Sequence, residues 1–161
     1  MKDLRIGYDE APDFEPPRRR WPQDFPELSL HRSRKDSDGP VRLSVPADPR
    51  YIGLARLCVA GVATSANARI DEIDDLRMAV TEACQWLLES TTGGSIELNV
   101  RRTPEGIEGS VAAYRGPGEQ PVREPSTLSR TILSSTVDRY EMVVDRSSPR
   151  CLFVKRLQPS D

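Results

Sequence analysis

The chain has 161 residues, a formal net charge of −2 and a mean hydropathy of −0.55. This length favours one folded domain, and the absence of a basic excess argues against direct nucleic-acid binding. The sequence contains neither a long apolar run nor the apolar core of a signal peptide, so we expect a cytoplasmic protein without membrane contact. The three cysteines are far apart in the sequence, which favours reduced thiols over a disulfide framework or a metal site.

Residues 1–40 differ from the rest of the chain in composition. Prolines interrupt this stretch repeatedly, and residues of both charges are dense but not periodic. Such a composition predicts a disordered tail. The alternative is a docking arm, whose anchors would be Phe14, Trp21, Phe25 and Leu28. The chain is therefore divided into a tail over 1–40, a folded domain over 41–157 and a short C-terminal tail over 158–161.

The folded part is predicted to begin with a strand and a helix. Residues 41–45, "VRLSV", alternate between apolar and polar, as a half-buried strand does. A helix follows from about Pro49, and its apolar residues recur at the spacing of one helical face. The predicted inward stripe consists of Leu54, Leu57, Cys58 and Val62. Arg56 lies off this stripe and should reach solvent.

A second helix is predicted over about 71–90, with Asp71 as its N-cap. The predicted core stripe consists of Ile73, Leu76, Val80, Cys84, Leu87 and Leu88. At about 100° per residue, Asp75, Met78, Glu82 and Trp86 fall roughly opposite that stripe. "STTGG" then ends the helix, with Gly93 or Gly94 as the left-handed stop.

Two hairpins complete the predicted domain. Residues 95–102 and 106–114 read as strands joined by the turn "TPEG", and 139–145 and 150–157 as strands joined by "RSSP". Between them lie a Gly- and Pro-rich loop over 115–126 and a short helix over 127–137, with Leu128, Ile132 and Leu133 inward. This order predicts an α+β two-layer sandwich, with a mixed or antiparallel sheet and helices on one face.

Two segments resemble a known family. "LRMAVTEAC", residues 76–84, is similar to the signature helix of the RsbW-like anti-sigma factors, a branch of the GHKL superfamily of ATPases and kinases. "LARLCVAGV", residues 54–62, is similar to the first helix of that family, with the family's arginine at Arg56. The resemblance covers roughly residues 41–157 and implies the GHKL, or Bergerat-type, ATPase fold.

The resemblance assigns roles on the signature helix. In the family a glutamate acts as general base, and an asparagine one turn later holds Mg²⁺ on the phosphates of ATP. Glu82 matches the base, as a retained or vestigial group. Trp86 stands at the asparagine position, and an indole offers no oxygen to a hard cation. We interpret Trp86 as a partly buried packing residue whose ring fills the former nucleotide pocket. Gln85 has a suitable oxygen but points about 100° away from Trp86. No metal site is expected.

The rest of the family's nucleotide site is also altered. An Asp-x-Gly segment should end a strand, but this chain has "YRG", with Tyr114 in place of the carboxylate. The glycine-rich loop before the third helix is reduced to Gly116 and Gly118. A degenerate nucleotide pocket formed by Gln85, Trp86, Tyr114, Gly116 and Gly118 is therefore expected. No cofactor is expected unless kinase activity is retained, in which case ATP with Mg²⁺ is required.

The resemblance also implies a function. The expected protein is an anti-sigma factor that sequesters an RNA polymerase sigma factor and is displaced by an anti-anti-sigma protein of the STAS type. Partner contacts are expected at Tyr51, Arg56 and Leu57, and a homodimer through 41–45 and the 50–62 helix. The alternative is an active serine/threonine kinase that phosphorylates the antagonist. A third possibility is a regulatory domain without a sigma partner, since one fold hosts several functions.

Overall fold

The structure, a computed structural model, describes residues 39–116 and 118–158. The anchors considered for the N-terminal tail, and the last three residues, lie outside this part of the chain. The elements in chain order are β1 (Val41–Pro46), a 3-10 turn η1 (Pro49–Tyr51), α1 (Ile52–Ser65), α2 (Ile70–Glu89), β2 (Ser95–Thr103), β3 (Gly106–Tyr114), α3 (Thr127–Thr136), β4 (Arg139–Val143) and β5 (Arg150–Arg156). The predicted order of strands and helices is confirmed.

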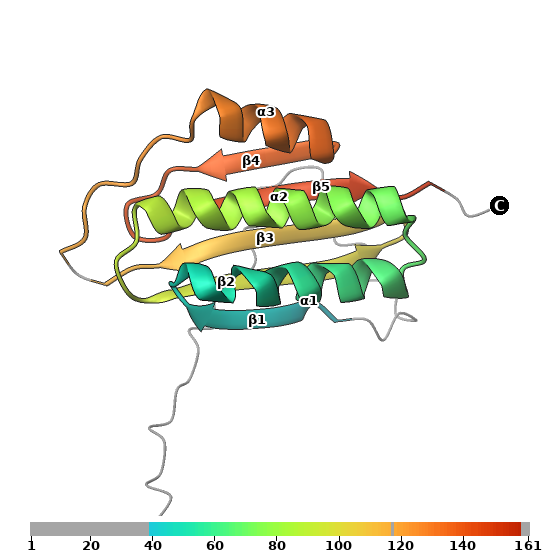
Figure 1. Ribbon diagram of the computed structural model, residues 1–161, viewed down its shortest axis with the longest axis horizontal. Coiled ribbons are helices and arrows are strands. Elements are labelled where there is room, and N and C mark those ends of the chain that lie inside the picture. Colours follow the sequence, from blue (N-terminus) through green and yellow to red (C-terminus); the bar gives the residue numbers. More distant parts are fainter. Residues whose placement is uncertain (1–38, 117, 159–161) are drawn as a thin grey trace, which may run out of the picture. The chain divides into compact units, whose positions relative to one another are not determined.

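The five strands form one antiparallel sheet in the order β1-β2-β3-β5-β4. The two predicted hairpins, β2–β3 and β4–β5, join side by side through β3 and β5. The three helices lie together on one face of this sheet, with α2 between α1 and α3 (Figure 1). The predicted α+β sandwich is therefore confirmed.

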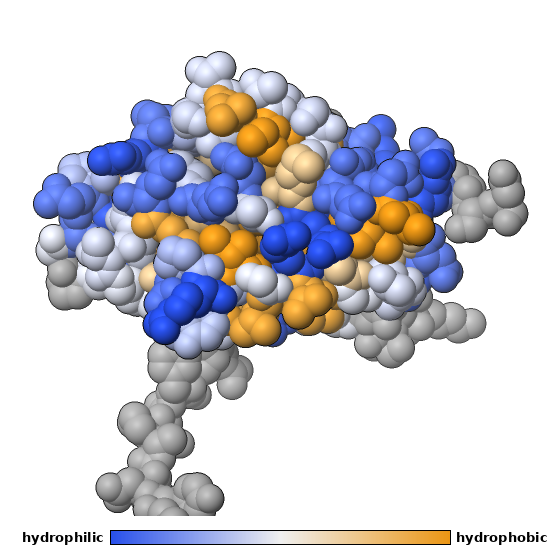
Figure 2. Space-filling view, in the orientation of Figure 1, coloured by the Kyte–Doolittle hydropathy of each residue, from blue (hydrophilic) through white to orange (hydrophobic). Residues whose placement is uncertain are grey.

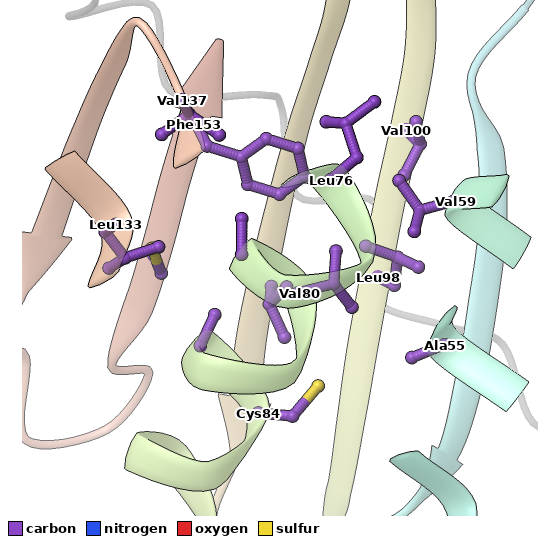
Figure 3. Packing of buried hydrophobic residues seen from close by; sticks show 14 of the residues in the cluster. Ala55, Val59, Leu76, Val80, Cys84, Leu98, Val100, Leu133, Val137 and Phe153 are labelled. Carbon is purple, nitrogen blue, oxygen red and sulfur yellow. The ribbon is translucent and has the colours of Figure 1, made fainter. Parts of the chain in front are cut away.

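The core lies between the sheet and the helices (Figure 3). Because side chains alternate along a strand, Ile107, Val111 and Ala113 of β3 point toward the helix layer. Gly109 occupies the same face opposite Phe153, and a Cβ at this position would lie 2.2 Å from the Phe153 ring. The missing side chain thus lets the buried ring lie across the central strand.

Helix α1 buries a different face from the predicted one. The buried residues are Ala55, Val59, Val62 and Ala63. Leu54 is 46% exposed and Leu57 is 66% exposed, so their assignment to the core was wrong. The helix is apolar nearly all round, and its periodicity therefore fits more than one inward face. Small alanines face inward, which allows close packing, and the larger leucines face outward.

Helix α2 begins two residues earlier than predicted, with Arg69 as its N-cap in place of Asp71. The Glu72 carboxylate closes this end, because Oε2 accepts from the Arg69 amide at 2.7 Å and Oε1 accepts from the Gln158 amide at 2.8 Å. At the other end the helix stops at Glu89. Gly94 lies beyond it, at φ 76°, and serves the turn into β2 rather than the helix stop.

The three cysteines are free and differ in burial. Burial raises the pKa of the Cys84 thiol to about 12, and burial together with the neighbouring Cys84 raises that of Cys151 to about 12. Burial also raises the pKa of Cys58, which is only half-buried. Since the thiolate is the reactive form, maleimide at pH 8 should label Cys58 in the folded protein and the other two only after denaturation. Peptide mass spectrometry checks this, and equal labelling of all three would contradict it.

Candidate functional site

Trp86 lies inside the protein, which agrees with its interpretation as a packing residue, although the helical pattern had placed it opposite the main core stripe. Its side chain is 1% exposed, and its indole N–H donates to the Arg123 carbonyl at 2.9 Å. The prediction assumed that α2 has one buried face. Because α1 and α3 flank α2 on both sides, its buried arc is wider than one stripe and includes Trp86 (Figure 1).

Glu82 lies one turn before Trp86 on α2 and is half-buried. Its carboxylate makes no hydrogen bond or ion pair with any residue that the structure describes. Gln85 is exposed. The two residues therefore project from the helix differently, and of this trio only Trp86 is buried and hydrogen-bonded.

The strand end "YRG" brings its middle residue, not its first, to the helix layer. Tyr114 pairs with Ser95 and has the same alternation as Glu108 and Ser110, so its side chain lies on the sheet face away from the helices. Arg115 instead reaches the end of α2, where its guanidinium donates to the Ser90 carbonyl. The structure thus does not bring Tyr114 together with Glu82 and Trp86.

Arg115 was not singled out from the sequence, although it makes the largest set of polar contacts in this region. Its guanidinium donates to the carbonyls of Ser90, Gln120 and Arg146, the last at 3.0 Å. It also binds the Glu119 carboxylate at 2.8 Å. An arginine placed directly after a strand and before a Gly- and Pro-rich loop is the only sequence signal for this role.

The two remaining glycines, Gly116 and Gly118, line a surface hollow of about 510 Å³. The other lining residues are Arg115, Glu119, Asp145, Arg146 and Ser147. Neither Glu82 nor Trp86 belongs to this lining. The glycines therefore face the turn between β4 and β5 rather than the candidate base.

These residues do not fit a Mg²⁺–ATP site. The indole at position 86 has no oxygen to offer to a hard cation, and its N–H is already bonded within the protein. Arg115, a group suited to phosphate binding, has its donors directed at carbonyls and at Glu119. Within the described residues, no group of three or more His, Cys, Asp or Glu side chains could hold a metal ion.

A second candidate surface lies on the outer face of α1. Leu54 and Leu57 are exposed there on either side of Arg56, which is also exposed. Figure 2 shows hydrophobic surface over this helix. Tyr51, the N-cap of α1, is half-buried. An arginine between exposed leucines combines the charged and apolar contacts that are common in protein interfaces.

Comparison with known proteins identifies several similar sequences. The Serine-protein kinase RsbW of Bacillus subtilis is 48% identical over 44 residues, which make up 27% of this chain and 28% of that protein. The RsbW of Halalkalibacterium halodurans is 28% identical over an alignment of 123 residues that covers 65% of this chain and 76% of that protein. The chain thus spans about a quarter of the first relative's length. No family model matches the chain.

The fold has a counterpart among solved structures. The crystal structure of the RsbU and RsbW domains of Rv1364c from Mycobacterium tuberculosis matches with a TM-score of 0.61 at 15% identity. The match covers 76% of this chain and 34% of that one. No helix of the described residues is long and apolar enough to cross a membrane. The chain is therefore similar in sequence to the RsbW serine-protein kinases, and its fold resembles that of the solved RsbU and RsbW domains.

Proposed function

We propose that this protein is an anti-sigma factor that works by competitive binding. It would sequester an RNA polymerase sigma factor and release it to an anti-anti-sigma protein of the STAS type. Such a protein acts in the cytoplasm and has no need to contact nucleic acid or membrane. The observation that carries the proposal is the outer face of α1, where Leu54 and Leu57 lie exposed beside Arg56.

The exposed leucines support a binding surface because large apolar side chains are more stable when a partner covers them than when they contact water. Burial of apolar area stabilises a complex by roughly 25 cal/mol per Å² before the costs of association. Tyr51, Arg56 and Leu57 are the proposed partner contacts. A homodimer through β1 and α1 is also proposed, since β1 is an edge strand.

Catalysis forms no part of this function. The position that should supply a metal ligand carries the buried Trp86, whose indole N–H is bonded to the Arg123 carbonyl, and Gln85 is exposed. The alternative is an active serine/threonine kinase that phosphorylates the antagonist with ATP and Mg²⁺. Glu82 favours it, because this half-buried carboxylate has no partner among the described residues, and the curated relatives are named serine-protein kinases.

The test is affinity capture with the full chain, followed by mass spectrometry. Recovery of a sigma factor and of a STAS-type antagonist is expected, and recovery of neither would overturn the proposal in favour of a domain with another partner. The same purified protein is then assayed with labelled ATP, Mg²⁺ and the captured antagonist. We expect no transfer and no rise of Tm by more than about 1 °C. Robust transfer that Glu82→Gln abolishes would establish the kinase alternative.

A further inference from the structure

The segment that follows β3 is tied to the end of α2 by Arg115. The Arg115 side chain is 3% exposed and the Glu119 side chain is 7% exposed. The guanidinium binds the carbonyls of Ser90, Gln120 and Arg146 as well as the Glu119 carboxylate. It therefore joins the end of α2, the segment itself and the β4–β5 turn at one buried point.

A second tie holds the same segment further along. The Arg123 backbone is bonded on both sides, because its amide donates to Ser90 Oγ at 2.8 Å and its carbonyl accepts from the Trp86 indole at 2.9 Å. Both partners belong to the C-terminal end of α2 or its cap. Two separate points therefore attach residues 118–125 to this end of the helix.

The hydrogen bonds made by Arg115 and Trp86 favour a single position of residues 118–125, packed against the end of α2. Each guanidinium nitrogen of Arg115 donates at least one hydrogen bond, and the charge is balanced by Glu119, whose other oxygen accepts from the Gly116 amide at 3.2 Å. Charge-assisted hydrogen bonds shielded from water are stronger than neutral ones. Withdrawal of the segment would break both ties. It would remove two of the acceptors of Arg115, Glu119 and the Gln120 carbonyl, and the acceptor of the buried Trp86 indole, which is costly.

We propose that Arg115, with Trp86 and Ser90, forms a latch that keeps residues 118–125 closed on α2 without any bound nucleotide. This inference rests on the proposed loss of ATP chemistry. It assigns the contacts that hold the segment in place to side chains of the protein and not to a nucleotide. The latch makes the shape of this end of the domain constant, so that partner binding through α1 needs no nucleotide.

Hydrogen–deuterium exchange of the full chain, read by mass spectrometry, tests the latch. In the wild type, slow exchange is expected at the Arg123 amide, and addition of ATP with Mg²⁺ should not change it. Arg115→Ala should speed exchange across 118–125 by about tenfold or more, while exchange in β2 and β3 stays the same. Arg130→Ala is the matched control, because Arg130 forms only an exposed pair with Glu124 at 3.6 Å.

Two milder variants keep the test valid if Arg115→Ala fails to fold. Ser90→Ala removes the acceptor of the Arg123 amide, and Trp86→Phe removes the indole donor but keeps an aromatic ring. Each should speed exchange at Arg123 severalfold. The latch proposal would be overturned if residues 118–125 of the wild type exchanged as fast as a free peptide of this sequence. It would also be overturned if ATP slowed this exchange, or if none of the three variants changed it. Sigma-factor capture is read separately, so a failed latch with intact capture, or the reverse, shows which proposal is wrong.

Discussion

Leu57→Asp should abolish binding of the sigma-factor partner and leave the fold intact. Leu57 is 66% exposed on α1, so the change removes no core contact in the free protein. In a complex it would bury an unpaired carboxylate where an apolar anchor had been, and it would place a negative charge beside Arg56. A loss of affinity of about 100-fold or more is expected, which corresponds to roughly 3 kcal/mol. Calorimetric titration with the captured partner measures it.

Leu128→Asp is the matched control for this experiment. Leu128 was predicted to face inward, but it is 67% exposed on α3, so that prediction was wrong. The same chemical change is therefore made at the same degree of exposure on another helix. Its partner affinity should stay within about twofold of the wild type, because surface changes outside an interface have small effects. Thermal unfolding of both variants verifies the fold. Equal losses at the two positions, or none at Leu57, would contradict the assignment of the α1 surface.

Trp86→Ala should lower the free energy of unfolding by about 3–5 kcal/mol, the range for large-to-small changes in a core. The side chain is 1% exposed and is hydrogen-bonded to the Arg123 carbonyl, so the change leaves a cavity and a carbonyl without its donor. Urea unfolding measures the effect. A cost of this size would show that Trp86 stabilises the core.

Glu82→Gln provides the comparison one turn away on the same helix. Because Glu82 is half-buried and makes no hydrogen bond or ion pair with the described residues, the change should alter stability by no more than about 0.5 kcal/mol. A Trp86→Ala cost below about 1 kcal/mol, or a Glu82→Gln cost equal to it, would reverse the roles assigned to the two residues.

Local pattern was sufficient for the elements and their order. Alternation and turn residues identified both hairpins, and the apolar period of α2 identified Leu76, Val80, Cys84 and Leu87 as core residues. These features depend on neighbours in sequence, which is why they can be predicted without a structure. The motif in α2 likewise pointed to the RsbW-like fold, with which the structural comparison agrees.

Patterns within one helix did not show which neighbours would cover it. Leu54 and Leu57 were predicted to face inward because the α1 sequence fits several faces, yet the alanines are buried. The angle of Trp86 around the α2 axis, away from the main stripe, was predicted correctly. That side of the helix is nevertheless buried, because α3 and the segment before it cover it. A helical period gives angles around an axis, but only packing decides which angles are buried.

The sequence by itself determined the strand and helix order, the antiparallel hairpins and the family resemblance, because these follow from the spacing of nearby residues. Only the tertiary structure decided the exposed face of α1, the elements that cover Trp86 and the role of Arg115. Two of the acceptors of Arg115 are distant in sequence, 25 residues before it, at Ser90, and 31 residues after it, at Arg146. Contacts between residues so far apart exist only once the sheet and helices have packed, so no local pattern encodes them.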